Sequence, residues 1–423
     1  MINMNKNDLK ICLINPPSPF LINRMVFPPL GLMTLSAFFK EHGYTNIQFI
    51  DMIGADKDYS TVKADIFFIY VATPNLEFAK DAMVMFKKNN ISAKFIVGGP
   101  HPTLAAEDCQ WADAIVIGDG EIAGLQILKD YPNIKKIYRE TKIENLDEIP
   151  FPDRSIIDIK MYADNYKLRG VPTTTLITSR GCSWGKCAFC CKYQLPGSKV
   201  RYRSAQNIVD EIKEIQEKYD IHGFMVFDDE FVSGKRRLKE FCELVTPLNI
   251  KWRCLARVES ITNKVVSVMA DSGCVEIAVG IESADQEILN TINKNIDINK
   301  AEKACQIIKD NDIYLKELFI IGLPDESRES LRKMDEFITR TKPFDIDTTI
   351  LSVFPGSDIY NYPEKYPNLT FKRGCRGWYK GIPGNYNTLC KISTPTLTFD
   401  ELVEARDELE RKHKPKEKLM VKE

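Results

Sequence analysis

Four of the twelve cysteines lie close together in the middle of the chain, at Cys182, Cys187, Cys190 and Cys191. The spacing Cys182-x4-Cys187-x2-Cys190 places three thiolates on one short stretch. Thiolates are soft ligands that favour zinc, copper(I) or an iron–sulfur cluster. The question is therefore which of these groups the three closely spaced thiolates would bind.

Zinc is one alternative, but a structural zinc site needs a closed set of four ligands. The chain has only four histidines and no second cysteine pair at zinc-site spacing. A thioredoxin-like redox pair of Cys187 and Cys190 would leave Cys182 and Cys191 unexplained. A four-iron cluster held by three thiolates, with one iron open to another ligand, accounts for the spacing better.

Six other cysteines stand singly in apolar stretches: Cys12, Cys109, Cys242, Cys254, Cys274 and Cys305. A buried free cysteine behaves as a small hydrophobic residue, so we expect these to pack in the core. The polar N-terminus lacks the apolar segment of a secretory signal, and a disulfide framework is not expected.

The cysteine motif follows an apolar run that reads as a strand, and five more such runs come after it, separated by helical patterns. The expected strands cover residues 173–177, 224–227, 251–255, 275–280, 315–321 and 347–354. Six strand–helix units predict an open, partial (β/α)6 barrel. Sites in barrels of this kind lie at the carboxyl ends of the strands.

Polar residues follow these strands where such a site would be. Asp228 follows the second strand, Arg257 the third, and Glu282 and Ser283 the fourth. Taken singly, an acidic run after a strand is usually a solvated loop, and an arginine before a helix is usually a surface charge. Only as a set do these residues indicate a site.

Residues 8 to about 145 also alternate strand and helix patterns. The expected strands cover 10–14, 47–51, 66–72, 94–97 and 114–117, and the expected helices cover 30–41 and 78–88. This alternation predicts an α/β domain with a doubly wound, Rossmann-like parallel sheet. Ligands of such sheets bind beyond the carboxyl ends of the strands.

Glycine, proline and small polar residues fill those strand ends: Asn15-Pro16-Pro17, Thr73-Pro74-Asn75, Gly98-Gly99-Pro100 and Gly118-Asp119-Gly120-Glu121. Glycines allow a backbone to approach a ligand closely. No Gly-x-Gly-x-x-Gly follows the first strand, so the pattern is a poor match to a dinucleotide site. From the residues alone, a ligand site and a merely structural sheet both stay open.

A proline-rich stretch at 149–154 marks the end of the first domain. We expect a Rossmann-like domain at 1–148, a linker at 149–170, the partial barrel at 171–358 and a C-terminal extension at 359–423. Residues 372–384, rich in glycine and basic residues, should either cap the barrel mouth or cover the open edge of the barrel, and a charged helix is expected at 399–412. The cysteines of the extension, Cys375 and Cys390, cannot complete a second cluster alone.

The charge balance limits the possible partners. Lysine and arginine number 58 against 59 aspartate and glutamate, a net charge of −1 at pH 7. A balance near zero gives no electrostatic footprint for nucleic acid or for an anionic membrane surface. The longest apolar runs have the length of a strand, far short of a membrane span. We therefore expect a cytoplasmic protein without a membrane or nucleic-acid partner.

The cysteine motif, with aromatic Phe189 before its last cysteine, resembles that of the radical S-adenosylmethionine superfamily. The usual spacing there is Cys-x3-Cys-x2-Cys, and this chain has one more residue in the first gap. The resemblance implies a [4Fe-4S] cluster on Cys182, Cys187 and Cys190. S-adenosylmethionine would bind the open iron, and an electron from the cluster would cleave it to a 5'-deoxyadenosyl radical. The longer gap leaves Cys191 as the substitute ligand.

The barrel strand ends resemble the same superfamily, which carries acidic residues, Arg, Gly-Ile-Glu-Ser and Gly-Leu-Pro after its second to fifth strands. The implied contacts to S-adenosylmethionine are Phe189, Asp228, Arg257, Gly280, Glu282 and Ser283. A guanidinium suits a carboxylate through bidentate geometry, so the resemblance directs Arg257 to the carboxylate of S-adenosylmethionine.

The N-terminal strand ends resemble the cobalamin-binding domain fused to many radical enzymes, through Asn-Pro-Pro at 15–17, Phe-Pro-Pro-Leu-Gly-Leu at 27–32 and Val-Gly-Gly-Pro-His-Pro-Thr at 97–103. The implied cobalamin contacts are Asn15, Pro16, Thr73, Gly98, Gly99, Gly118 and Glu121, with Thr73 and the glycine pair at 98–99 along the nucleotide tail. Other cobalamin proteins offer a histidine to cobalt from Asp-x-His-x-x-Gly. Here residues 51–54 read Asp-Met-Ile-Gly, so a histidine ligand is not expected.

Together the resemblances imply a cobalamin-dependent radical enzyme, first of all a methyltransferase acting on an unactivated carbon. A rearrangement, cyclisation or oxidation, with cobalamin in another role or the domain empty, is the alternative. A non-catalytic iron–sulfur or zinc binding module is a third. Methylthio transfer would need another N-terminal cysteine cluster, and only Cys12 and Cys109 lie there. The substrate would be a small molecule or peptide, and the reductant a flavodoxin or ferredoxin.

Overall fold

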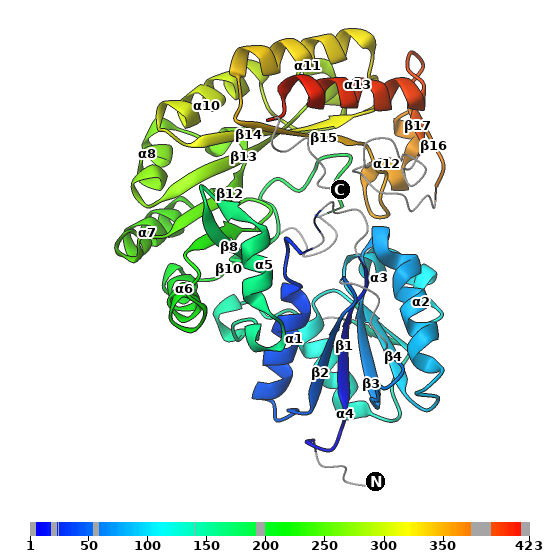
Figure 1. The fold of residues 1–423 in the computed structure, drawn as a ribbon. Helices are drawn as coiled ribbons and strands as arrows, with labels where there is room; N and C mark the ends of the chain where they lie inside the picture. Colours follow the sequence, from blue (N-terminus) through cyan, green and yellow to red (C-terminus); the bar gives the residue numbers. More distant parts are fainter. Residues whose placement is uncertain are drawn as a thin grey trace. The chain divides into compact units, whose positions relative to one another are not determined.

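The computed structural model describes residues 6–17, 23, 25–53, 59–139, 141–191, 199–373 and 391–415. The chain divides into two units (Figure 1). The first comprises Met1–Asn165 with Gln194–Pro196, and the second Tyr166–Tyr193 with Gly197–Glu423. The division falls after Asn165, inside the expected linker at 149–170. Gly54, Cys375 and Cys390 lie outside the described residues.

The first unit is a six-stranded parallel sheet in the order β2-β1-β3-β4-β5-β6, which confirms the doubly wound fold. Its elements are β1 (Ile11–Asn15), α1 (Leu30–Glu41), β2 (Ile47–Asp51), β3 (Ile66–Tyr70), α2 (Leu76–Lys87), β4 (Lys94–Gly98), α3 (Pro100–Leu104), β5 (Ala114–Ile117), α4 (Gly120–Asp130), β6 (Ile137–Arg139) and α5 (Ile159–Asn165). The sixth strand was not expected, since it has three residues and only Tyr138 is buried.

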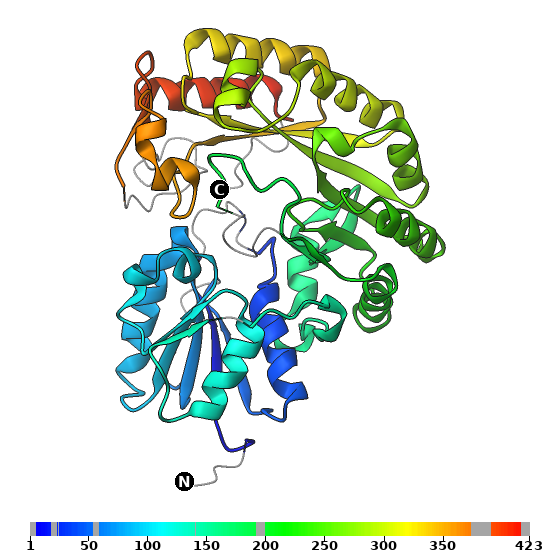
Figure 2. The ribbon, with the colours of Figure 1, turned by 180° about the vertical axis from the view of Figure 1, so that it is seen from behind.

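Helices cover both faces of this sheet (Figures 1 and 2). Helices α1 and α4 pack on one face, over a core that includes Leu13, Phe39 and Phe68. Helix α2 packs on the other, over a core that includes Phe67 and Phe86. Neighbouring strands β1 and β3 therefore send their following helices to opposite faces. The crevice expected at such a switch point opens at the carboxyl ends of these two strands.

The segment after β6 is fastened to helix α1 through Asp153. Its carboxylate Oδ2 accepts hydrogen bonds from Ser36 Oγ at 2.8 Å and Lys40 Nζ at 2.6 Å, and its backbone N–H donates to Met33 O at 3.0 Å. Partial burial alone would raise the pKa of Asp153, but the bonds from Lys40, Ser155 and Ser36 hold it below its usual range.

The second unit confirms the partial barrel. A curled sheet runs in the order β15-β14-β13-β12-β11-β8-β7, with β8 to β15 parallel and only β7 antiparallel. The elements are β7 (Lys167–Leu168), β8 (Val171–Leu176), β9 (Ser179–Arg180), β10 (Arg201–Tyr202), α6 (Ala205–Tyr219), β11 (Gly223–Val226), α7 (Lys235–Val245), β12 (Lys251–Ala256), α8 (Asn263–Asp271), β13 (Cys274–Glu282), α9 (Gln286–Thr291), α10 (Ile298–Asp310), β14 (Tyr314–Ile321), α11 (Arg328–Thr341), β15 (Asp345–Ile350), α12 (Asp358–Asn361), β16 (Thr370–Phe371), β17 (Ile392–Ser393) and α13 (Phe399–His413). Figure 1 shows α6, α7, α8, α10 and α11 on the outside of the curl.

The last barrel strand differs from the expectation of 347–354. Strand β15 begins two residues earlier and ends at Ile350, although the backbone N–H of Leu351 still donates to Ile321 O at 2.9 Å. The apolar run continued to Phe354 in the sequence because Leu351 and Val353 are buried without being part of the strand.

Charged residues are buried at the amino ends of the barrel strands. Arg253 on β12 lies 3.1 Å from Glu276 on β13 and donates to the Tyr166 hydroxyl at 2.7 Å. Lys316 on β14 lies 3.0 Å from Asp345 on β15. Opposite charges on adjacent strands thus close the end of the barrel remote from the expected site.

Helix α13 matches the expected helix at 399–412 and covers β15, where Thr348 Oγ1 donates to Glu410 Oε1 at 2.9 Å. The hydroxyls of Thr394 and Thr396 donate to the Glu326 carbonyl, at 2.9 and 3.2 Å. Helix α13 therefore covers the sheet edge at β15, whereas residues 374–384, most of the stretch expected to cap the barrel mouth or cover its edge, lie outside the described residues.

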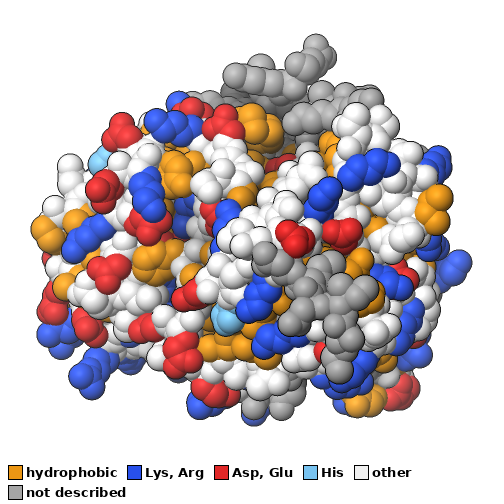
Figure 3. All heavy atoms as spheres, turned by 90° about the horizontal axis from the view of Figure 1, so that it is seen from below, with side chains coloured by type: hydrophobic (Ala, Val, Ile, Leu, Met, Phe, Trp, Pro, Cys, Tyr) orange, Lys and Arg blue, Asp and Glu red, His pale blue; other side chains and the backbone are white. Residues whose placement is uncertain are grey.

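No helix in the described ranges is long and apolar enough to cross a membrane. On the face drawn in Figure 3, basic and acidic side chains are interspersed, in keeping with the net charge of −1.

The Asp153 contacts predict a pH-dependent contribution to stability. Asp153→Asn should lower the free energy of unfolding by about 2 kcal/mol at pH 7, since a charge-assisted pair of hydrogen bonds is lost. A carboxylate with a lowered pKa stabilises the fold at neutral pH, and this contribution disappears as the pH falls through that pKa. The difference measured by urea denaturation should therefore shrink towards pH 3. Exposed Asp164→Asn is the control, and an equal loss in both variants would contradict the role given to Asp153.

Candidate functional site: the cysteine loop and the glycine-rich strand ends

The cysteine loop begins after β8 and the two-residue strand β9. Gly181 and Gly185 take positive φ values, +114° and +60°, so the chain reverses at both positions. Within the motif, the backbone N–H of Cys190 donates to Cys187 O at 3.0 Å. Cys182, Cys187, Cys190 and Cys191 form no disulfide and are partly exposed, whereas the six single cysteines are buried, as expected.

Ala188 fastens the second half of the motif to two later parts of the chain. Its N–H donates to Ile292 O at 2.8 Å, and its carbonyl accepts from the Ile359 N–H at 3.1 Å. The residue is 1% exposed. Backbone bonds of this kind hold Cys187 and Cys190 in place whatever their side chains bind.

The longer first gap is also braced. Trp184 Nε1 donates to Asn293 O at 2.8 Å, and Asn293 Nδ2 donates back to Lys186 O at 3.1 Å. Ser183 Oγ donates to Glu230, whose other oxygen accepts from Ser260 Oγ at 2.9 Å. The additional residue therefore lies in a segment that is tied to the turn after α9 and to Glu230.

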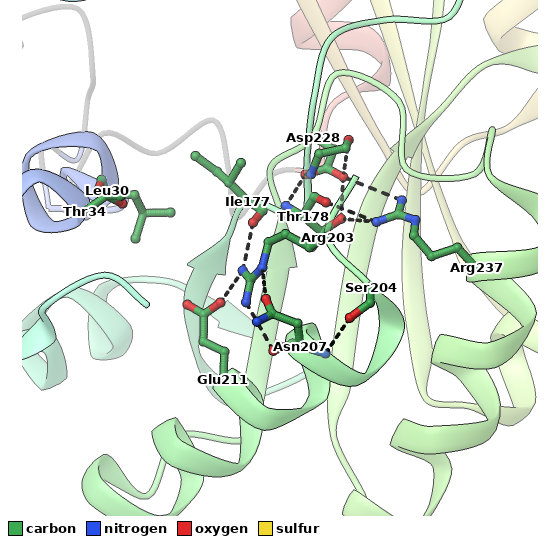
Figure 4. Close-up of polar contacts among 11 residues, drawn as sticks. Leu30, Thr34, Ile177, Thr178, Arg203, Ser204, Asn207, Glu211, Asp228 and Arg237 are labelled. Atoms are coloured by element: carbon green, nitrogen blue, oxygen red, sulfur yellow. Dashed lines mark hydrogen bonds and ion pairs between the residues drawn. The ribbon is translucent and has the colours of Figure 1, made fainter. Parts of the chain in front are cut away.

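Asp228 secures the two residues that lead into the motif (Figure 4). Its Oδ1 accepts from the N–H groups of Thr178 and Ser179, at 2.6 and 3.1 Å. Its Oδ2 accepts from their hydroxyls, at 2.5 and 2.7 Å. Burial raises the pKa of Asp228, and the four hydrogen bonds and Arg237 oppose that rise. Its contact with S-adenosylmethionine stays a prediction.

Two arginines support the same segment. Arg237 donates to the Thr178 carbonyl and hydroxyl at 3.2 and 2.8 Å, and lies over the rings of Tyr202 and Phe231. Arg203 donates to Ile177 O at 3.0 Å and to the carboxylate of Glu211 (Figure 4). The chain just before the cysteines is thus held from β11, α6 and α7.

The end of β13 has an irregular backbone. The register with β14 shifts between Gly280 and Glu282, and Glu282 has a φ of +69°, a conformation unusual for a residue with a side chain. A Cβ on Gly280 would lie 2.5 Å from Glu282 Oε1 and 3.0 Å from Lys294 Nζ. Gly280 is therefore required for the close approach of this pair. Ser283 is fully buried and accepts from the Asp285 N–H at 3.2 Å.

Lys294 and Arg257 bring positive charge to the cysteine loop. Lys294 Nζ lies 2.6 Å from Glu282 Oε1 and 5.9 Å from the centre of the Phe189 ring. Burial would lower the pKa of Lys294, but Glu282 and Cys187 raise it above its ordinary value. Burial raises the pKa of Cys187, and both Lys294 and Arg257 act to lower it. Arg257 also donates to Lys294 O at 3.2 Å.

The donor chemistry fits a thiolate-bound cluster. Three partly exposed sulfurs lie on one braced loop, next to a buried ammonium and a guanidinium that would compensate the charge of thiolate ligands. Within the described residues, no three His, Cys, Asp or Glu side chains converge on one ion position. The three cysteines would be the cluster ligands, with the fourth iron left open.

In the first unit, the expected cobalamin contacts gather at the strand ends around the switch point. Asn15 Nδ2 donates to Asp51 Oδ1 at 3.0 Å, and the other Asp51 oxygen accepts from the Tyr162 hydroxyl. Pro16 and Glu121 are buried, the latter in the first turn of α4. The aspartate of the incomplete Asp-x-His motif thus ties β1, β2 and α5 together.

The glycine-containing loops after β4 and β5 lie next to each other at the carboxyl ends of the strands. A Cβ on Gly99, whose φ is +115°, would lie 2.8 Å from Val71 O, so only glycine allows this approach to the end of β3. Thr103 Oγ1 donates to Gly99 O at 2.8 Å and accepts from the Gly118 N–H at 3.0 Å. Gly99 therefore serves the close packing of the end of β4 against the end of β3, and the contact of Gly98 and Gly99 with cobalamin stays a prediction.

Three residues of these sites were missed in the sequence. Glu230, Lys294 and Thr103 each make their contacts across the fold or between adjacent loops. Thr103 and Glu230 belong to local sequence patterns that did not reveal these contacts, and Lys294 belongs to none. Lys294 follows an exposed Asn293 and precedes an exposed Asn295, as a surface lysine would. For Glu230 the sequence did offer a signal, the acidic run 228–230. Two of its three carboxylates are buried in the structure rather than solvated.

Comparison with known proteins identifies both halves of the chain. The model of the Radical SAM superfamily matches residues 176–338, and that of the B12 binding domain matches residues 24–128. An uncharacterized methyltransferase of Pyrococcus horikoshii is 30% identical over 84% of this chain and 83% of its own length. The anaerobic magnesium-protoporphyrin IX monomethyl ester cyclase of Rubrivivax gelatinosus is 26% identical over 79% of this chain and 66% of its own.

The fold also matches a solved structure. The radical S-adenosylmethionine methyltransferase TsrM of Kitasatospora setae, described with cobalamin and a [4Fe-4S] cluster bound, superposes with a TM-score of 0.71 at 13% identity. The match covers 85% of this chain and 76% of that one. At this identity the likeness is one of fold.

The Asp228 contacts predict that its loss releases the cysteine loop. Asp228→Ala leaves the buried N–H and hydroxyl groups of Thr178 and Ser179 without their acceptor and Arg237 without its ion-pair partner, so the free energy of unfolding should fall by about 3 kcal/mol or more. Iron bound after anaerobic reconstitution should fall in parallel. Urea denaturation and iron analysis measure the two effects, with exposed Asp271→Ala as control. Full iron content in Asp228→Ala would contradict the positioning role.

Gly280 gives a second prediction. The methyl group of Gly280→Ala should displace the Glu282–Lys294 pair and weaken S-adenosylmethionine binding about tenfold, the effect of one lost charge-assisted bond. The iron content should stay unchanged because no cysteine is touched. Equilibrium dialysis of reconstituted protein measures the affinity. Gly234→Ala is the matched control, since its nearest neighbour lies at an ordinary 3.5 Å. An unaltered affinity in Gly280→Ala would show that the Glu282–Lys294 pair does not contribute to S-adenosylmethionine binding.

Proposed function

Because the chain belongs to the radical S-adenosylmethionine enzymes that carry a B12-binding domain, we propose that it transfers a methyl group from cobalamin to an unactivated carbon of its substrate. Its cofactors are a [4Fe-4S] cluster, S-adenosylmethionine and cobalamin. The observation that carries the proposal is the presence, in one chain, of a braced three-cysteine loop and a glycine-lined switch-point edge. The Pyrococcus relative, which matches over most of both chains, bears the name of a methyltransferase.

When bound, the cofactors supply the chemistry, namely a radical that removes a hydrogen atom and a methyl group that replaces it. The protein contributes position and charge. Asp228 and Ala188 fix the two halves of the cysteine motif. The cluster ligands in this proposal are Cys182, Cys187 and Cys190.

The proposed S-adenosylmethionine site lies along the end of β13. Gly280 leaves room there, and the buried Glu282–Lys294 pair provides one acceptor and one donor beside Cys187. Arg257 has a side chain that is 12% exposed and already bonds Glu259 at 3.2 Å. Its guanidinium has five N–H donors, so it retains the capacity to meet the carboxylate of S-adenosylmethionine.

A second reaction is favoured by the Rubrivivax relative, whose name is that of a cyclase rather than a methyltransferase. The same sites would then serve a radical cyclisation or oxidation without methyl transfer. The two candidates differ in one product, S-adenosylhomocysteine, which forms when S-adenosylmethionine restores the methyl group on cobalamin.

For the partners, we propose a small-molecule or peptide substrate and a flavodoxin or ferredoxin as electron donor, in the cytoplasm. One-electron carriers of this kind supply low-potential electrons to iron–sulfur centres. The nearly balanced charge gives no electrostatic support to nucleic acid.

The proposal predicts the products of one anaerobic assay. Protein from cobalamin-supplemented cells should contain about four irons and about one corrinoid per chain, as a single [4Fe-4S] cluster and one cobalamin require. Reduced with dithionite in the presence of S-adenosylmethionine, it should form both 5'-deoxyadenosine and S-adenosylhomocysteine, measured by mass spectrometry. 5'-Deoxyadenosine without S-adenosylhomocysteine, at full corrinoid content, would overturn methyl transfer and favour the cyclase-like reaction.

Cysteine variants provide the control for this assay. Cys190→Ala should abolish both iron binding and 5'-deoxyadenosine formation, whereas Cys191→Ala should retain both. The reverse result would shift the ligand register by one residue.

A further inference from the structure

A hydroxyl, an imidazole and a carboxylate form a chain in the first unit, outside the roles given above. Thr73 Oγ1 lies 3.0 Å from His101 Nδ1, and His101 Nε2 lies 3.3 Å from Asp108 Oδ2. The histidine is fully buried and Thr73 is 7% exposed. Thr73 stands where the chain leaves β3 and turns into α2, at the switch point beside β1.

The backbone enforces this arrangement. The N–H of His101 donates to Val71 O at 3.1 Å, the same carbonyl that excludes a side chain at Gly99. Prolines on both sides of His101 restrict the backbone of the short helix α3. The imidazole is thus held beside Thr73 by the approach of β4's end to β3's end.

The contacts of His101 exclude one role and indicate another. Because both ring nitrogens face protein groups, His101 is not presented as a ligand to cobalt, although it lies at the strand ends. A hydroxyl can take part in up to three hydrogen bonds, and the bond to His101 fixes its position while leaving capacity for a ligand. Asp108 Oδ2 lies within ion-pair distance of Nε2 rather than in a hydrogen bond, so it favours this ring orientation through its charge.

We propose that His101, oriented by Asp108, is a positioning residue that presents the Thr73 hydroxyl to the nucleotide tail of cobalamin. The inference rests on cobalamin binding by this domain and not on methyl transfer. It makes the affinity for the tail depend on a residue that does not itself touch the cofactor.

The test compares two corrinoids, hydroxocobalamin and cobinamide, which lacks the nucleotide tail. Thr73→Val should weaken hydroxocobalamin binding about tenfold, the effect of one lost hydrogen bond, and leave cobinamide binding unchanged. His101→Leu should do the same, whereas His101→Asn, which keeps a polar atom near the Nδ1 position, should restore part of the affinity. Binding is measured by absorbance titration of the apoprotein, independently of turnover.

A double-mutant cycle separates positioning from a general effect on the fold. If His101 acts through Thr73, then His101→Leu should cost nothing further in the Thr73→Val background, because the hydroxyl it positions is gone. His42→Asn is the matched control, since His42 also holds a ring-nitrogen bond, to Phe38 O at 2.8 Å. It should change neither affinity.

The outcomes distinguish this inference from the proposed function. Additive losses in the double variant, or equal losses for both corrinoids, would overturn the positioning role while cobalamin dependence stands. A wild-type chain that binds neither corrinoid would overturn both. His101→Leu protein that loses cobinamide binding together with thermal stability would show a structural role only, and would also overturn the inference. The affinities of His101→Asn and Asp108→Asn for hydroxocobalamin show whether another polar side chain can replace either residue.

Discussion

A buried carboxylate is stable only when its oxygens are supplied with hydrogen bonds, and Asp228 meets that condition with four, all from Thr178 and Ser179. These two residues lie between the end of the barrel strand β8 and the positive-φ position at Gly181. Asp228 therefore ties the start of the cysteine motif to the end of the second barrel strand. Glu230, two residues further on, holds Ser183 inside the motif in the same way. What resembles a solvated acidic loop in the sequence anchors the loop that carries the proposed cluster ligands.

The two ends of the barrel strands use buried charge differently. At the amino ends, Arg253 with Glu276 and Lys316 with Asp345 are paired strand to strand, and such pairs add little net stability compared with apolar packing but allow only one arrangement of the strands. At the carboxyl end of β13, the Glu282–Lys294 pair lies next to Cys187. Lys294 is not part of a barrel strand, so the pair does not join two adjacent strands. The charge of Lys294 acts on Cys187 of the cysteine loop rather than on a neighbouring strand, so we expect it to be available to a ligand bound there.

The sequence predicted the elements with a strong period well. Helix α1 was expected at its observed bounds, since a long periodic run indicates a helix, and the bounds of β2 and β5 were also as expected. The short, half-exposed β6 carried no such signal, and the apolar run to Phe354 exceeded β15 because burial does not require a strand. The site divided in the same manner. Cysteine spacing and glycine-rich strand ends are local patterns, whereas Lys294 acts through contacts that exist only after folding.

The extra residue in the first gap of the cysteine motif illustrates how local departures are absorbed. Cys187 and Cys190 flank Ala188, whose two backbone hydrogen bonds lead to Ile292 and Ile359, and these bonds do not depend on the length of the gap before them. The additional residue lies instead in the segment 183–186, which Trp184 and Asn293 tie to the turn after α9. Gly185, at a φ of +60°, supplies the reversal that the longer segment needs. The spacing of the motif can therefore change in such a barrel while the backbone at Cys187 and Cys190 stays in place.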